Sequence, residues 1–87
     1  MAYRNEWIKA MIAKVEGMFE TQLHPFLEDE YYGHEFMQYR LVKALKGDIF
    51  FKFCEYGNKS FISVDGHFFY EKNQSMFDAF LGEIVVL

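Results

Sequence analysis

Apolar residues near the start of the chain recur every three or four positions, from Trp7 to Phe19. That spacing places them on one stripe of an amphipathic helix, which we predict over about Asn5 to Gln22. Asn5 suits the N-terminal cap because its side chain can accept a backbone N–H. His24-Pro25 ends this helix, since proline lacks an N–H and disfavours helical geometry in the residue before it.

Between residues 48 and 71 the period changes to two, which predicts a three-stranded antiparallel meander. Gly57-Asn58 and Asp65-Gly66 both tolerate positive φ, as two-residue hairpin turns require. These turns set Ile62 opposite both Phe53 and Phe69. Side chains alternate between the faces of a strand, so one face is the predicted core: Ile49, Phe51, Phe53, Ile62, Val64, His67 and Phe69. The other face carries Phe50, Lys52, Cys54, Phe61, Ser63, Phe68 and Tyr70.

Residues 34–46 fit two different structures. As a helix, Met37, Leu41 and Leu45 share one face, and Gly47 supplies a left-handed C-terminal cap. As a strand, residues 36–45 would pair with residue 49 onward across Lys46-Gly47, which sets Arg40 against Phe53 on the core face. Because a charge is a poor neighbour for a core side chain, we favour the helix.

The C-terminal segment is predicted to begin with a short helix. Ser75 with Asp78 has the spacing of a capping box, and Gly82 is suited to end the helix. Residues 83–87 are then a β-prone tail that could add an edge strand; the alternative is one continuous helix to the end. Together these elements predict a single α+β domain over residues 1–87.

Composition narrows the class of protein. The chain is 52% hydrophobic and 21% aromatic, which excludes a disordered chain. A single cysteine rules out a disulfide framework and favours a reducing compartment. No apolar run approaches the roughly 18–20 residues that a membrane span requires, and no targeting segment is recognisable. We therefore expect a cytoplasmic protein that does not bind a membrane.

No catalytic, cofactor or metal site is predicted. The register of the meander places Cys54 and its nearest histidine, His67, on opposite faces, so they cannot form a nucleophile and base pair. Two histidine–carboxylate pairs around Gly33 have helical spacing, but zinc motifs such as CxxC and HExxH are absent. Phosphate-binding glycine loops and a nucleophile elbow are also absent. We expect neither an enzyme nor a cofactor.

Charge is segregated along the chain. The net charge is −4, but residues 16–35 carry −6 and residues 36–60 carry +3. The acidic run at residues 28–30 is followed by two tyrosines, which supply large contact area at low entropic cost. Aromatic anchors combined with segregated charge are typical of an interaction surface. The predicted partner-contact residues are Glu28, Asp29, Glu30, Tyr31, Tyr32, Phe50, Phe61, Phe68 and Tyr70.

These observations predict a small acidic protein-interaction module that inhibits a partner protein by occlusion, or serves as an adaptor. Its acidic block would act as a negatively charged mimic facing a basic surface. In general character the chain is similar to small accessory proteins of phages and mobile elements that block host enzymes. A homodimer formed through the aromatic sheet face is a rival within this class.

An alternative from another class uses the same sheet face. Aromatic rings beside lysines can stack single-stranded nucleic acid. The balance of 13 acidic against 9 basic residues disfavours it. The opposing structural interpretation is that a helix covers these rings.

Overall fold

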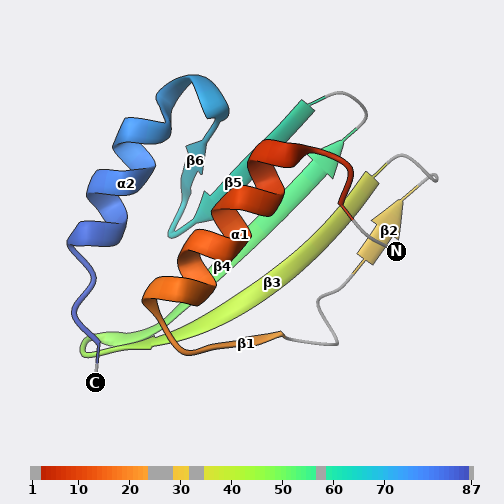
Figure 1. The fold of residues 1–87 in the computed structure, drawn as a ribbon. Coiled ribbons are helices and arrows are strands. Elements are labelled where there is room, and N and C mark those ends of the chain that lie inside the picture. The colour runs from red at the N-terminus through yellow and green to blue at the C-terminus, as the bar shows by residue number, and fades with distance from the viewer. Residues whose placement is uncertain (1–2, 24–28, 32–34, 57–58, 87) are drawn as a thin grey trace.

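The chain folds as a layer of helices on a layer of sheet, which confirms the predicted α+β class (Figure 1). The computed structural model describes residues 3–23, 29–31, 35–56 and 59–86, with side chains for 3–21, 37–55 and 59–86. In this part of the chain the elements are α1 (Glu6–Met18), β1 (Thr21–Leu23), β2 (Asp29–Tyr31), β3 (Glu35–Ala44), β4 (Gly47–Tyr56), β5 (Lys59–Val64), β6 (His67–Phe69), the 3-10 helix η2 (Glu71–Asn73) and α2 (Gln74–Gly82).

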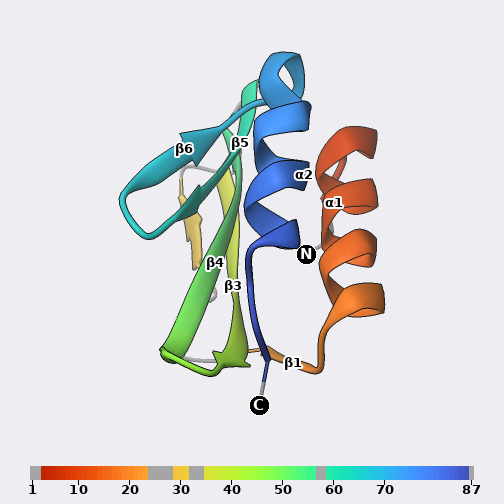
Figure 2. The same cartoon turned by 90° about the vertical axis from the view of Figure 1, so that its left-hand side faces the viewer.

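All strand pairs are antiparallel, and the sheet has the order β1-β3-β4-β5-β6, with β2 also pairing with β3. Both helices lie on the same side of this sheet (Figure 2). The C-terminal end lies beside the turn between β3 and β4 (Figure 1).

The predicted meander is confirmed as β4, β5 and β6. Ile62 pairs with Phe53 on one side and with Phe69 on the other, as the turn positions require. Asp65 has φ 52° and Gly66 has φ 78°, so both central residues of the second hairpin occupy the left-handed region. The predicted turn at Gly57-Asn58 lies outside the described residues.

The helix favoured over residues 34–46 is wrong, and the strand alternative is right. Residues 35–44 form β3, which pairs with β4 along its whole length; residue 34 lies outside the described part. The turn is one residue earlier than expected, with Ala44 opposite Gly47, so Arg40 opposes Phe51 rather than Phe53. Ten consecutive pairs with β4 outweigh the local preference for helix.

Helix α1 is shorter than the predicted span from Asn5 to Gln22. Asn5 caps it as expected, because its Oδ1 accepts the Ile8 N–H at 2.9 Å. The helix ends at Met18, and the next residue is already extended. Residues 21–23 then pair with residues 40–42 of β3. Residues 21 and 22, predicted as the end of the helix, therefore belong to a strand.

Helix α2 begins at Gln74, and the predicted cap at Ser75 is wrong. The residue before the helix, Asn73, instead turns its side chain back and accepts the Tyr70 N–H at 2.6 Å. This contact closes η2, so the chain is already helical before Ser75 is reached. The predicted end at Gly82 is confirmed.

The tail after α2 neither continues the helix nor forms a full edge strand. It makes a single antiparallel bridge between Val86 and Ala44, and the Leu45 N–H donates to the Val85 carbonyl at 2.6 Å. The edge-strand prediction is therefore right about the place of the tail and wrong about the extent of pairing. Leu87 lies outside the described residues.

The core lies between the sheet and the helices. Phe77 of α2 packs edge-on against Phe51 at 6.2 Å and contacts Phe69 at 5.2 Å between ring centroids. Burial of each such side chain contributes about 1.5–3 kcal/mol. The predicted core position of His67 is wrong: it is exposed, because it begins β6 directly after the hairpin turn. The buried cluster is Tyr3, Trp7, Ile8, Met11, Ile12, Val15, Val42, Phe51, Phe53, Ile62, Val64, Phe69, Phe77 and Leu81.

A buried carboxylate fixes the start of α1 to the sheet. The Glu55 side chain, only 8% exposed, accepts backbone N–H groups from Arg4 at 3.0 Å and from Asn5 at 2.7 Å. The Tyr3 hydroxyl donates to the Phe53 carbonyl at 2.7 Å, and burial raises the pKa of this phenol. A negative charge beside the first N–H groups of a helix also complements its dipole.

We predict that Glu55→Ala lowers the free energy of unfolding by about 2 kcal/mol, because it leaves the partly buried N–H groups of Arg4 and Asn5 without their acceptor. Urea denaturation measures this loss. The exposed carboxylate variant Glu71→Gln is the control and should change stability by less than about 0.5 kcal/mol. Equal midpoints for Glu55→Ala and the wild type would show that the carboxylate does not hold α1.

Candidate interaction surface

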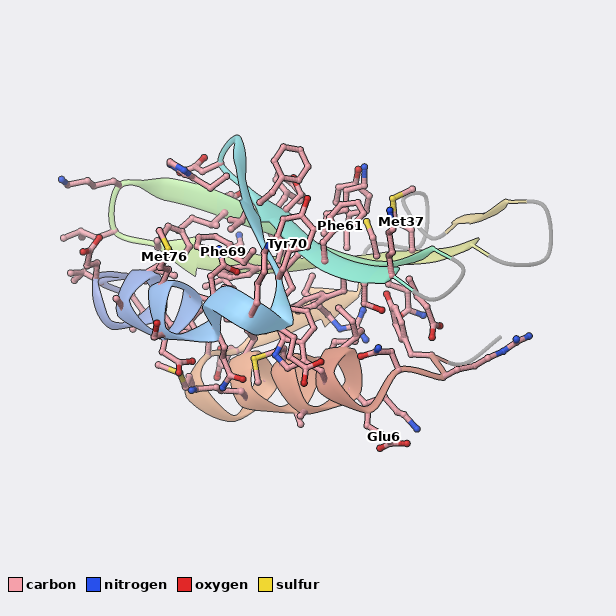
Figure 3. The ribbon with its side chains drawn as sticks, turned by 90° about the horizontal axis from the view of Figure 1, so that it is seen from above. Glu6, Met37, Phe61, Phe69, Tyr70 and Met76 are labelled. Carbon is pink, nitrogen blue, oxygen red and sulfur yellow. The ribbon has the colours of Figure 1, made fainter. Side chains whose placement is uncertain are left out.

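Within the residues that the structure describes, one face of the sheet carries no helix. Figure 2 shows α1 and α2 on the same side, and no described element covers the other. Because opposed residues share a face and neighbours alternate, the strand register assigns residues to this side. Figure 3 shows Met37 and Phe61 on the side of the sheet away from the helices. Among the residues with described side chains, we call the following set the open face: Met37, Tyr39, Leu41, Lys43, Asp48, Phe50, Lys52, Cys54, Lys59, Phe61, Ser63 and Phe68, with Tyr70 at the end of β6.

Aromatic side chains dominate the centre of the open face. The ring of Phe61 lies 5.7 Å from that of Phe68 and 6.1 Å from that of Tyr70. Phe68 is 56% exposed, and Phe50 and Tyr70 are each 41% exposed. Leaving such side chains in water forgoes hydrophobic stabilisation, so adjacent exposed rings indicate a contact surface more than a solvated face.

The interpretation that a helix covers these rings is wrong, because each of the two helices has one apolar stripe and buries it on the core side of the sheet. The stripe of α1, including Ile8 and Val15, is buried on the core side, as are Phe77 and Leu81 of α2. Each helix has only one such stripe. Because the apolar stripes of both helices pack on the core side, no described element covers the second face of the sheet.

Lysines surround the aromatic centre. Lys43, Lys52 and Lys59 lie on the open face, and the strand register places three acidic residues on the same side of the sheet: Asp48 opposite Lys43, Glu35 opposite Tyr56 and Asp29 opposite Met37. The Lys52 Nζ lies over the Tyr39 ring, 5.9 Å from its centroid. Lys72 places its Nζ at the same distance from the Tyr70 centroid. A cation near a ring face is held by the ring quadrupole, so these lysines belong to the surface that the rings form.

A depression borders the open face at the β1 edge. It is lined by Leu41 and Lys43 of β3, by residues 16–21 and by Val86. Glu16 and Glu20 are exposed on its wall. The open face therefore meets acidic side chains from the end of α1 at this edge.

The predicted acidic contact segment is only partly described. Asp29, Glu30 and Tyr31 form the short edge strand β2, where Asp29 pairs with Met37. Glu28 and Tyr32 lie outside the described residues. Partner contact at this segment stays a prediction. The four aromatic residues predicted from the meander are brought to one face.

Sequence reasoning missed the part of the surface that β3 contributes. Met37, Tyr39 and Leu41 are half-buried on the open face. Their alternation with Gln38 and Arg40 was a signal of period two, but the same residues also fit a helical stripe. Because a helix was predicted for residues 34–46, these three residues were not part of the predicted contact surface.

The chemistry of the open face does not favour catalysis by Cys54. Its side chain is 6% exposed, and burial raises the pKa of the thiol to about 11, with Lys52 acting in the opposite direction. A nucleophilic cysteine needs a lowered pKa. The register places His67 on the opposite face, as predicted. Among the residues described, no group of three histidine, cysteine or carboxylate side chains could hold a metal ion.

Comparison of the chain with protein-family models, with curated proteins and with solved structures finds no match. Within the described residues, no helix has the length and apolar character that crossing a membrane would require.

We predict that Cys54 reacts slowly with iodoacetamide in the folded protein. With a pKa of about 11 in place of 9.0, the thiolate fraction at pH 8 falls roughly a hundredfold. Mass spectrometry of native and urea-unfolded protein measures the two rates. Because the chain has one cysteine, the unfolded sample is its own control. Equal rates would show that the thiol is not protected by burial.

Proposed function

We propose that this protein is a protein-interaction module that uses the open face to cover or recruit a partner protein, as an inhibitor or an adaptor. The observation that carries the proposal is the exposure of Phe50, Phe68 and Tyr70 on a sheet face without a helix. An aromatic centre that loses its water on contact is the usual energetic core of such an interface.

The arrangement of the surface supports contact more than chemistry. Its centre is aromatic and its charged residues lie around that centre, which matches the division of protein interfaces into apolar core and polar rim. Cys54, the reactive side chain type nearest the centre, is buried and protonated at neutral pH.

The acidic block supplies a second part of the proposal. Glu16 and Glu20 are exposed at the end of α1, next to the depression that borders the open face. Together with the acidic residues near 28–30, they would orient the module on a basic region of the partner, as a negatively charged mimic does. Charge of this kind mainly increases the association rate.

Single-stranded nucleic acid is the second candidate occupant of the open face. The observation that favours it is that three lysines share the face with the aromatic rings.

Site-specific photo-crosslinking tests the proposed function. A photoreactive phenylalanine analogue in place of Phe68 should crosslink to one protein in extract of the source cells, because this position is 56% exposed at the aromatic centre. The matched control is the same analogue at Ala13, which is exposed on α1 on the helix side. Crosslinking from both positions, or from neither, would contradict the proposal.

Once the partner is isolated, Phe68→Ala should weaken its binding about tenfold or more, as expected for a central aromatic anchor. Surface plasmon resonance measures the affinity. Ala13→Ser is the control and should bind as the wild type does. Circular dichroism establishes that both variants stay folded, which is expected because Phe68 contributes little to the core.

A further inference from the structure

We infer that the depression at the β1 edge is a binding site for one arginine side chain of the partner protein. Its lining comes from residues 16–21, from β3 and from the C-terminal tail. Figures 1 and 2 show the end of α1, the start of β1 and the C-terminal end at the same corner of the molecule. The inference rests on the proposed function, and it specifies which side chain of the partner the acidic end of α1 receives.

Two carboxylates on the wall of the depression lack a cationic partner. Glu16 and Glu20 are exposed, and within the described part of the chain neither forms an ion pair. Among the described lining residues the one cation is Lys43, which the strand register sets opposite Asp48. With two carboxylates against one ammonium group, the depression is negatively charged and attracts a cation.

The end of α1 adds acceptors of the same sign. The Phe19 N–H is the last to donate into the helix, to the Val15 carbonyl at 2.9 Å, so the carbonyl groups of residues 16–18 have no partner within it. They carry the negative end of the helix dipole, where a basic side chain is favourable. The last turn of α1 contains no basic residue, so the helix itself does not compensate this charge.

The apolar part of the lining favours arginine among the cationic side chains. Met18 and Val86 are each 48% exposed, and Leu41 is half-buried beside the depression. An arginine side chain can lay its methylene groups on such a surface while the guanidinium stays at the polar wall. Its planar group presents five N–H donors, which suits several carbonyl and carboxylate acceptors at once. The lysine ammonium is a strongly hydrated point charge and suits them less well.

The depression is continuous with the open face, since Leu41 and Lys43 belong to both. Leu41 also pairs with Phe50, one of the exposed rings of that face. A partner that covers this ring therefore lies next to the depression. An arginine at the margin of its contact surface would place a charged group at the rim of the interface, where such groups set orientation and register.

An NMR titration of the folded protein tests the inference without knowledge of the partner. The probes are N-acetyl-arginine methylamide and N-acetyl-citrulline methylamide, which have nearly the same shape and differ in charge. At low salt, the arginine derivative should shift the amide signals of Gly17, Thr21 and Lys43 and bind about fivefold more tightly than the citrulline derivative. The amide signal of Ala13, which is exposed on the same helix, should not move.

A pair of double variants supplies the control. Glu16→Gln/Glu20→Gln should lose the preference, so that the two derivatives bind equally well. Glu6→Gln/Glu71→Gln removes two charges at exposed positions outside the depression and should keep it. All four positions are exposed, so both variants are expected to stay folded. Equal affinities of the wild type for the two derivatives, no shift at the three amides, or the same loss in both variants would overturn the inference.

Failure of this inference can be told apart from failure of the proposed function. If the Phe68 position crosslinks to one protein while the arginine derivative shows no preference, the function stands and the arginine site is wrong. If the arginine derivative binds as expected and the Phe68 position gives no crosslink, the site stands and the function proposed for the open face is wrong.

Discussion

The pairing of β3 with β4 is the constraint on which the rest of the structure depends. It runs through ten consecutive residue pairs, from Glu35 opposite Tyr56 to Ala44 opposite Gly47. Because each strand alternates its side chains, this one register decides which residues of both strands join the core and which join the open face. Because residues 35–44 form a strand and not a helix, α1 and α2 are the two α-helices that cover the sheet within the described part of the chain. The exposed aromatic face follows from this arrangement.

The outer edge of β3 shows how the chain protects such a long strand. Three short segments share this edge: β2 opposite residues 35–37, β1 opposite residues 40–42, and the C-terminal tail at Ala44. A long unpaired edge would be a template for pairing with another chain, and short covering segments reduce that risk. The structure thus limits association through this edge of the sheet. The same register sets Arg40 opposite Phe51 on the core side. As a result, the Nη1 atom of Arg40 is buried without a hydrogen-bond partner.

The two faces of the sheet have different physical roles. On the core side, the aromatic rings of β4 and β6 are sealed by Phe77 and by the stripe of α1, and Glu55 holds the first residues of that helix. On the open face, rings of the same chemical type contact one another, and charged residues of both signs lie around them. The difference lies entirely in what covers them. The core on the other side, with the helices, supplies the free energy of folding that lets this face stay exposed.

The sequence by itself determined the local features whose causes are local. The Asn5 cap, the end of α2 at Gly82, the turn at Asp65-Gly66 and the facing of the meander residues all follow from neighbouring side chains and backbone preferences. Only the tertiary structure decided the state of residues 35–44, the early end of α1 at Met18 and the exposed position of His67. Residues such as Met37 and Leu41 satisfy both a helical stripe and an alternating strand, so the choice between them depends on the long-range partner, β4, which no local pattern contains. Which sheet face stays open is decided in the same way, because it depends on where both helices pack.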